Sequence, residues 1–70
     1  MTEAVQIERQ GAVATVILER REARNAVDPA TAERLAAAFL EIERDDSLRV
    51  SVLWGAGGTF CAGADLKAVA

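Results

Sequence analysis

The chain has 70 residues, a net charge of -3, one cysteine and no histidine. A chain this short buries only about 60% of its unfolded surface and usually needs a disulfide framework or a structural metal. The lone Cys61, with no histidine beside it, excludes both. A hydrophobic fraction of 51% with 27% charged residues is that of a globular protein. The composition therefore predicts a globular chain that something outside these residues completes.

The distribution of charge excludes several kinds of partner. Eight Lys and Arg are scattered among eleven Asp and Glu without a basic cluster, so we expect no nucleic-acid partner. Residues 1–4 lack the basic and apolar regions of a secretory signal, and no apolar run approaches the ~20 residues of a membrane span. An unpaired cysteine fits a reducing compartment. We therefore expect a cytoplasmic protein with no membrane partner.

Two strands open the predicted fold. Residues 5–8 alternate between apolar and polar side chains, and residues 13–18 are rich in β-branched side chains that suit a pleated surface. This pattern predicts an antiparallel hairpin with a tight turn at Gln10 and Gly11. The charged residues 19–25 have no apolar stripe and are interpreted as a solvated loop.

A helix is predicted after this loop. Asp28 can accept a hydrogen bond from an N–H of the first turn, and Pro29 is tolerated at the first helical position because its missing N–H would be unpaired there. Leu35, Phe39 and Ile42 then follow at helical spacing. The pattern indicates a helix that packs one apolar face on a sheet.

The second half of the chain predicts a third strand and a glycine-rich loop. Residues 50–54 form an almost continuously apolar run, which is typical of a strand covered on both faces. Strand, helix and strand in this order predict parallel pairing in an α/β fold. Residues 55–63 have the glycine content of a backbone built for close approach, and residues 64–67 resemble the opening of another helix. We expect residues 1–70 to be part of a single domain that is cut short.

Three anion-binding patterns were compared with this loop. The dinucleotide fingerprint fails because its third glycine falls on the large ring of Phe60. The phosphate-binding P-loop fails because Ala64 and Asp65 stand where the lysine and the hydroxyl belong. A small oxyanion, such as a thioester enolate, needs only N–H donors and a wall without bulky side chains, which Gly63 and Ala64 provide. A glycine-rich turn without any ligand is an equal alternative.

Two motifs resemble the crotonase, or enoyl-CoA hydratase/isomerase, superfamily. Residues 60–67 (FCAGADLK), after an apolar strand and a glycine pair, resemble its oxyanion-loop motif. Residues 22–26 (EARNA), before an amphipathic helix, are similar to its first CoA-contacting segment, and the spacing of the two blocks also matches. The resemblance covers essentially the whole chain. It implies the first part of a crotonase-like spiral of β-β-α units: a hairpin, a helix, a buried parallel strand, the oxyanion loop and the start of a second helix.

The resemblance also implies a site and partners. The thioester carbonyl of an acyl-CoA would be polarised by two backbone N–H donors, the first of them from Ala64. No separate cofactor is expected, because coenzyme A is part of the substrate, and the assembly would be a homotrimer or hexamer. The second donor and the catalytic carboxylates would lie after residue 70, in the rest of the polypeptide or in a second chain. The residues implied to line the CoA path are Arg24, Ala62, Gly63, Ala64, Asp65, Leu66 and, as a weaker phosphate contact, Lys67.

The reaction stays open at this stage. Hydration of a 2-enoyl-CoA is the default on family frequency. Isomerisation of the double bond, thioester hydrolysis and a non-catalytic role in acyl-CoA binding or assembly are the alternatives.

Several side chains in and around the loop were interpreted without catalytic roles. Cys61 has no histidine to activate it and is expected to behave as a small buried hydrophobe. Asp65 is expected to cap a helix or to line the site. Trp54 and Phe60 are expected to pack beneath the glycine turn. Arg24 is either a CoA contact or part of a solvated loop.

Overall fold

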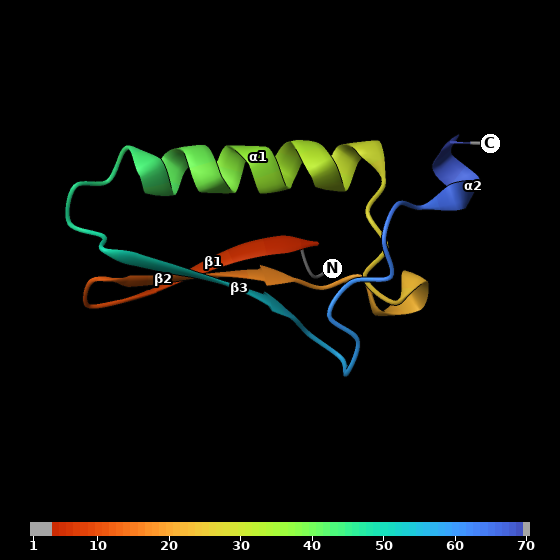
Figure 1. The fold of residues 1–70 in the computed structure, drawn as a ribbon, viewed down its shortest axis with the longest axis horizontal. Coiled ribbons are helices and arrows are strands. Elements are labelled where there is room, and N and C mark those ends of the chain that lie inside the picture. Colours follow the sequence, from red (N-terminus) through yellow and green to blue (C-terminus); the bar gives the residue numbers. More distant parts are fainter. Residues whose placement is uncertain (1–3, 70) are drawn as a thin grey trace.

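The computed structural model describes residues 4–69 and has two layers, a three-stranded sheet and a long helix across one of its faces (Figure 1). Residues 1–3, discussed above as the start of the chain, lie outside the described residues. The elements in chain order are β1 (Val5–Gln10), β2 (Val13–Leu18), the 3₁₀ helix η1 (Arg21–Ala23), α1 (Pro29–Glu43), β3 (Val50–Gly55) and α2 (Leu66–Val69).

The predicted hairpin is confirmed. β1 and β2 pair in antiparallel register, and Gln10 is the partner of Val13. The turn therefore consists of Gly11 and Ala12, so its predicted position was one residue too early. Gly11 has a φ of 58°, the left-handed region that a glycine enters without steric cost.

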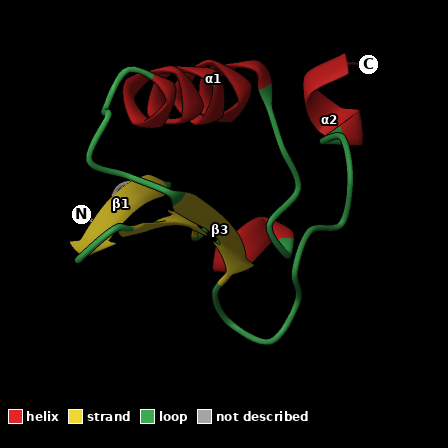
Figure 2. Ribbon diagram, turned by 60° about the vertical axis from the view of Figure 1, so that its left-hand side comes forward, coloured by secondary structure: helices red, strands yellow, loops and turns green. Residues whose placement is uncertain are grey.

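The predicted α/β crossover is also confirmed. β3 pairs with β2 in parallel register over its whole length, and the strand order is β1-β2-β3. The chain passes from β2 to β3 through α1, which packs mainly on β1 and β2. Figure 2 shows α1 on one face of the sheet, and the opposite face carries no α-helix among the described residues.

Helix α1 begins where the sequence indicated. The Asp28 side chain accepts a hydrogen bond from the Thr31 N–H at 2.8 Å, and Pro29 occupies the first turn. Leu35 and Ile42 pack against the core, as predicted. The prediction for Phe39 was wrong.

The core position on this face belongs to Ala38, which is 6% exposed, whereas Phe39 keeps 36% of its surface exposed. The stripe that faces β1 and β2 runs through Leu35, Ala38 and Ile42, and Phe39 lies about 100° further round the helix. The apolar core joins this stripe to the strands. Its buried members are Val5, Val16, Leu18 and Ala38.

The prediction that β3 is covered on both faces was wrong. β3 is the edge strand, and the exposed fractions are 54% for Val50, 43% for Val52, 40% for Leu53 and 54% for Trp54. One helix that packs mainly on β1 and β2 cannot cover both faces of a third strand. The apolar composition of β3 therefore does not indicate burial among the described residues.

No helix in the described part of the chain is long and apolar enough to cross a bilayer.

Candidate functional site

The structure brings the two predicted motifs together at the end of the sheet where β3 finishes. Three backbone hydrogen bonds join them: Ala62 N–H to Arg24 C=O at 3.1 Å, Val27 N–H to Gly63 C=O at 2.8 Å, and Asp65 N–H to Val27 C=O at 2.9 Å. In Figure 1 the segment that carries η1 and the blue loop before α2 lie side by side. A contact between these motifs is thus part of the fold itself.

Asn25 fixes this contact from inside. Asn25 is only 1% exposed, and its amide nitrogen donates to the carbonyls of Ala56 at 2.8 Å and Thr59 at 2.6 Å. Its amide oxygen accepts from the Arg20 N–H at 2.7 Å. The backbone of Asn25 has a φ of 60°, a conformation that asparagine tolerates better than most residues.

The prediction of a solvated loop over residues 19–25 was therefore only half right. Glu22 and Arg24 are exposed, but Asn25 is buried and the side chain of Arg20 is only 17% exposed. Local polarity predicts solvent exposure only where the polar groups find no partner in the protein. Here a distant loop supplies carbonyl partners for Asn25, which nothing in the local sequence indicates.

Gly55 permits the loop to fold back on itself. A Cβ at this position would overlap the carbonyl oxygen of Phe60 and would lie 2.6 Å from its Cα. Real Cβ atoms do not approach a backbone so closely, so only glycine fits without a shift of the loop. The prediction that this segment is built for close approach is confirmed.

The amide of Ala64 is left free by its neighbours. Ala64 forms an isolated parallel bridge with Val27, and the two hydrogen bonds of this bridge use the C=O of Gly63 and the N–H of Asp65. In this pattern the N–H of Ala64 itself points away from Val27. Within residues 4–69 this N–H donates to no backbone carbonyl, and Ala64 is exposed.

An open hollow of about 340 Å³ lies beside Ala64. The predicted site residues Ala62, Ala64, Asp65, Leu66 and Lys67 line it together with Glu22, Ala23 and Ala26 from the first motif. These last three belong to the segment 22–26 that resembles the CoA-contacting motif, although of that segment only Arg24 was predicted as an individual site residue.

Two predicted site residues are not among those that line the hollow. Gly63 contributes a carbonyl to the bridge with Val27 and has a φ of 102°, which a residue with a Cβ rarely adopts. Arg24 contributes a carbonyl to Ala62, while its side chain is exposed. Among residues 4–69, no carboxylate lies within ion-pair distance of the Arg24 guanidinium.

Asp65 caps α2, as predicted. Its Oδ1 accepts from the Lys67 N–H at 3.1 Å, and its Oδ2 accepts from Arg20 Nη1 at 3.3 Å. The side chain is 18% exposed. Both carboxylate oxygens of Asp65 are therefore engaged by groups of this chain, and Asp65 also lines the hollow.

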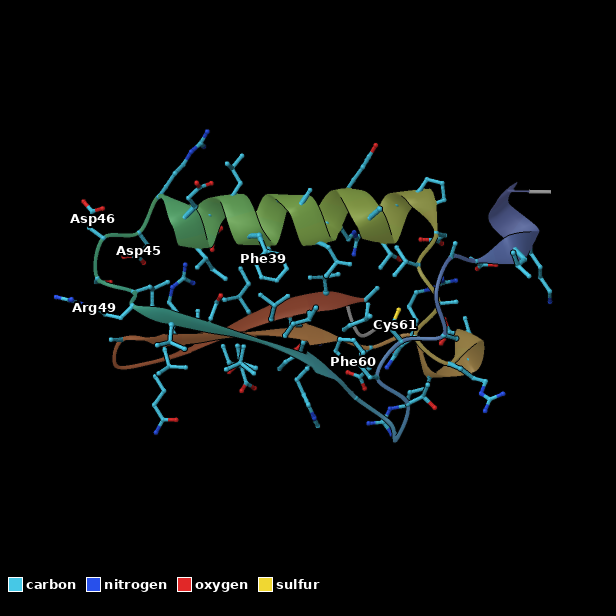
Figure 3. The ribbon with its side chains drawn as sticks, in the orientation of Figure 1. Phe39, Asp45, Asp46, Arg49, Phe60 and Cys61 are labelled. Atoms are coloured by element: carbon cyan, nitrogen blue, oxygen red, sulfur yellow. The ribbon has the colours of Figure 1, made fainter. Side chains whose placement is uncertain are left out.

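The two aromatic side chains near the loop do not pack beneath it, so that prediction was wrong. Phe60 is 57% exposed and Trp54 is 54% exposed. The space beneath the turn is filled by the Asn25 amide, and Gly55 approaches the backbone of Phe60, not its ring. Cys61 packs against the core, and its Sγ accepts from the Gly63 N–H at 3.4 Å (Figure 3). The prediction of a small buried hydrophobe is confirmed in part, because Cys61 packs against the core but is only partly buried.

A larger hollow of about 440 Å³ lies at the opposite end of the molecule, where Figure 3 labels Asp45, Asp46 and Arg49. Hydrogen bonds from Ser47, and more weakly the charge of Arg9, lower the pKa of Asp45. These bonds already engage the carboxylate, and in the described part of the chain no three metal-ligating side chains converge. None of the predicted site residues lines this hollow, so the site is assigned to the other end.

The chain is similar to known proteins in sequence and in structure. The sequence pattern of the enoyl-CoA hydratase/isomerase family matches residues 8–70. A carnitinyl-CoA dehydratase of Proteus mirabilis is 41% identical over 100% of this chain, and an enoyl-CoA hydratase of Mycobacterium tuberculosis is 40% identical over 89% of it. The crystal structure of an enoyl-CoA hydratase from Mycobacterium tuberculosis superposes on 96% of the chain with a TM-score of 0.92 and 39% identity.

These matches define a chain with the crotonase fold. It belongs to the enoyl-CoA hydratase/isomerase family. The chain spans 27% of the length of the Proteus protein, 23% of the curated mycobacterial protein and 30% of the chain in the crystal structure.

Replacing Asn25 tests whether its amide holds the two motifs together. We expect Asn25→Ala to destabilise the full-length protein, because each buried polar group left without a partner costs about 1–3 kcal/mol. The left-handed backbone adds about 1–2 kcal/mol for alanine. Urea unfolding measures the loss. Asn25→Gly is the matched control, because glycine adopts the left-handed backbone without strain but still lacks the amide that makes the hydrogen bonds. Wild-type stability of the glycine variant would contradict the account.

The cap at Asp28 predicts a dependence of stability on pH. Hydrogen bonds from the side chain and backbone of Thr31, with a smaller contribution from the charge of Arg20, lower the pKa of Asp28 below its ordinary 3.8. Because the folded state favours the carboxylate, its stabilisation is complete above the ordinary pKa and is lost as the pH falls through the lowered one.

Thermal unfolding of wild type and Asp28→Asn should therefore show a Tm difference that is full at neutral pH and narrows below about pH 4. Asp46→Asn, at an exposed position, controls for the loss of one carboxylate. A Tm difference that grows with acidification would rule out this assignment.

Proposed function

We propose that the full-length protein binds an acyl-CoA thioester in the hollow beside Ala64 and polarises the thioester carbonyl with the Ala64 N–H. The observation that carries this proposal is the exposed amide of Ala64, whose N–H donates to no group within residues 4–69 and is flanked on both sides by groups that are hydrogen-bonded to Val27. A donor held in this way needs no rearrangement when charge develops on an oxygen in front of it.

The proposed reaction is hydration of a 2-enoyl-CoA. Water adds to C3, a proton is delivered to C2, and negative charge passes through the thioester oxygen as an enolate. One well-placed donor to such an oxyanion contributes about 2.7–4 kcal/mol to lowering the barrier. Asp65 is engaged by Arg20 and Lys67, so it is not proposed as the proton carrier. We assign the proton-carrying carboxylates and the second donor to residues outside 1–70, in the same polypeptide or in a second chain.

The contacts to coenzyme A are proposed from charge and position. Backbone atoms of residues 62–66 would line the path of the ligand, and the exposed cations of Arg24 and Lys67 would meet its phosphates. Coenzyme A arrives as part of the substrate, so no separate cofactor is proposed. The family resemblance supports a homotrimer or hexamer, and the free thiol of Cys61 is in keeping with a cytoplasmic location.

A second candidate reaction is dehydration of a 3-hydroxyacyl-CoA, the reverse of the same chemistry. The observation that favours it is the 41% identity over the whole chain to a carnitinyl-CoA dehydratase. Both directions pass through the same enolate, so both need the Ala64 donor. Steady-state rates with crotonyl-CoA and with carnitinyl-CoA decide which acyl group the protein accepts.

Removing one hydrogen tests the proposal. Semisynthesis with lactate in place of alanine at position 64 of the full-length protein converts the amide to an ester. The ester oxygen replaces the Ala64 N–H, and the Gly63 carbonyl becomes a weaker acceptor for the Val27 N–H, so folding is checked beside turnover. We expect kcat for crotonyl-CoA hydration to fall by about 10²–10³-fold, because a transition-state donor is lost, while KM changes little.

Ala64→Gly is the matched control, since it keeps the N–H and the open wall, and it should retain most of the wild-type rate. An ester-containing protein that folds and turns over at the wild-type rate would overturn the assignment of Ala64.

A further inference from the structure

We propose that Arg20 is a positioning residue, which holds the Ala64 amide in place through the carboxylate of Asp65. The inference rests on the proposed function, because the position of Ala64 affects turnover only if its N–H is a donor. Arg20 itself is not proposed to contact substrate. It is not among the residues that line the hollow beside Ala64.

The guanidinium of Arg20 is shared between the starts of two helices. Its Nη1 lies 3.3 Å from Asp65 Oδ2, and its Nη2 lies 3.5 Å from Asp28 Oδ2. Nη1 also donates to the Ala26 carbonyl. The side chains of Arg20 and Asp65 are 17% and 18% exposed, so this pair is more shielded than an ordinary surface ion pair.

The carboxylates of Asp28 and Asp65 use their two oxygens in the same way. In each, Oδ1 caps its own helix: Asp28 accepts from the Thr31 N–H at 2.8 Å and Asp65 from the Lys67 N–H at 3.1 Å. In each, Oδ2 faces Arg20. One guanidinium therefore fixes the start of α1 relative to the start of α2.

Asp65 transmits this constraint to Ala64 because the two residues are adjacent. The Asp65 N–H is bound to Val27 on one side, and its side chain is bound to Arg20 on another. If this side-chain anchor is removed, residue 65 is held to the first motif only by its backbone hydrogen bond to Val27, because the Asn25 contacts lie earlier in the loop. A displacement of about 1 Å of a group that acts in the transition state can cost about 10²-fold in rate. Ground-state binding of CoA, spread over many contacts, depends less on this one position.

A set of three variants of the full-length protein tests the inference. Asp65→Asn keeps an oxygen that caps α2 but removes the charge that faces Arg20. Asp28→Asn makes the same change at the other helix and is the matched control. Arg20→Lys keeps the positive charge but loses the planar fork that reaches both carboxylates.

We expect Asp65→Asn and Arg20→Lys each to lower kcat by about 10–100-fold with little change in KM, and the double variant to be no worse than the poorer single one. Asp28→Asn should destabilise the protein without lowering kcat. Equal losses of kcat in Asp28→Asn and Asp65→Asn would overturn the inference, because a general loss of stability would then explain both. Losses in KM alone would overturn it as well.

Amide hydrogen exchange gives a readout that does not depend on the chemistry. Without substrate, the backbone N–H of residue 65 should exchange at least about tenfold faster in Asp65→Asn and Arg20→Lys than in wild type, because its hydrogen bond to Val27 opens more often. In Asp28→Asn it should exchange at the wild-type rate. Unchanged exchange in all three variants would overturn the inference.

This readout also separates the two proposals. If the ester at position 64 leaves turnover unchanged, the proposed function fails whatever the exchange rates show. If the ester slows turnover but faster exchange at Asp65 leaves kcat intact, only the positioning role of Arg20 fails.

Discussion

The buried amide of Asn25 is the interaction on which the rest of the site depends. It ties a loop that follows β3 to a segment that follows β2, and its donor and acceptor atoms are all engaged. Among the described residues, no buried side-chain polar atom lacks a hydrogen-bond partner. This satisfied polar contact holds together two segments that are distant in the sequence.

Charged side chains surround the Asn25 contact. The side chains around Asn25 include cations and carboxylates in close succession, and the structure sorts them by partner. Arg20 is drawn in between the caps of two helices, whereas Arg24 stays exposed without an ion-pair partner among residues 4–69. Arg20 is therefore the cation proposed to hold the loop, and Arg24 is the one proposed to meet a ligand. The backbone then supplies the chemistry, since the group proposed to act on the substrate is the N–H of Ala64.

The elements that could be predicted from the sequence are those whose causes are local. The hairpin follows from period-2 patterning, and the start of α1 follows from an Asp-Pro pair whose capping bond the structure contains. The predictions that failed concern burial, which depends on partners far away in the sequence. Ala38, and not Phe39, lies on the stripe of α1 that faces β1 and β2, and the apolar Trp54 lies on an uncovered edge strand.

The residues of the candidate site came from the motif resemblance, and their roles stay predictions. The motif containing Ala64 carried the resemblance, and the structure places the loop against the first motif. Asn25 makes that contact, but its burial was not predicted. No local signal in the sequence distinguishes a buried asparagine from one in a solvated turn. Polar residues become informative when a second segment supplies their partners, and only the fold shows which segment that is.

The most direct measurement is a crystal structure of the full-length protein with a non-hydrolysable acyl-CoA analogue bound. The account predicts that the oxygen in the thioester position lies about 2.7–3.1 Å from the Ala64 nitrogen, with the bridge to Val27 and the Asn25 contacts intact. An analogue bound with that oxygen directed away from Ala64, or a loop that leaves Asn25 when the ligand binds, would contradict it.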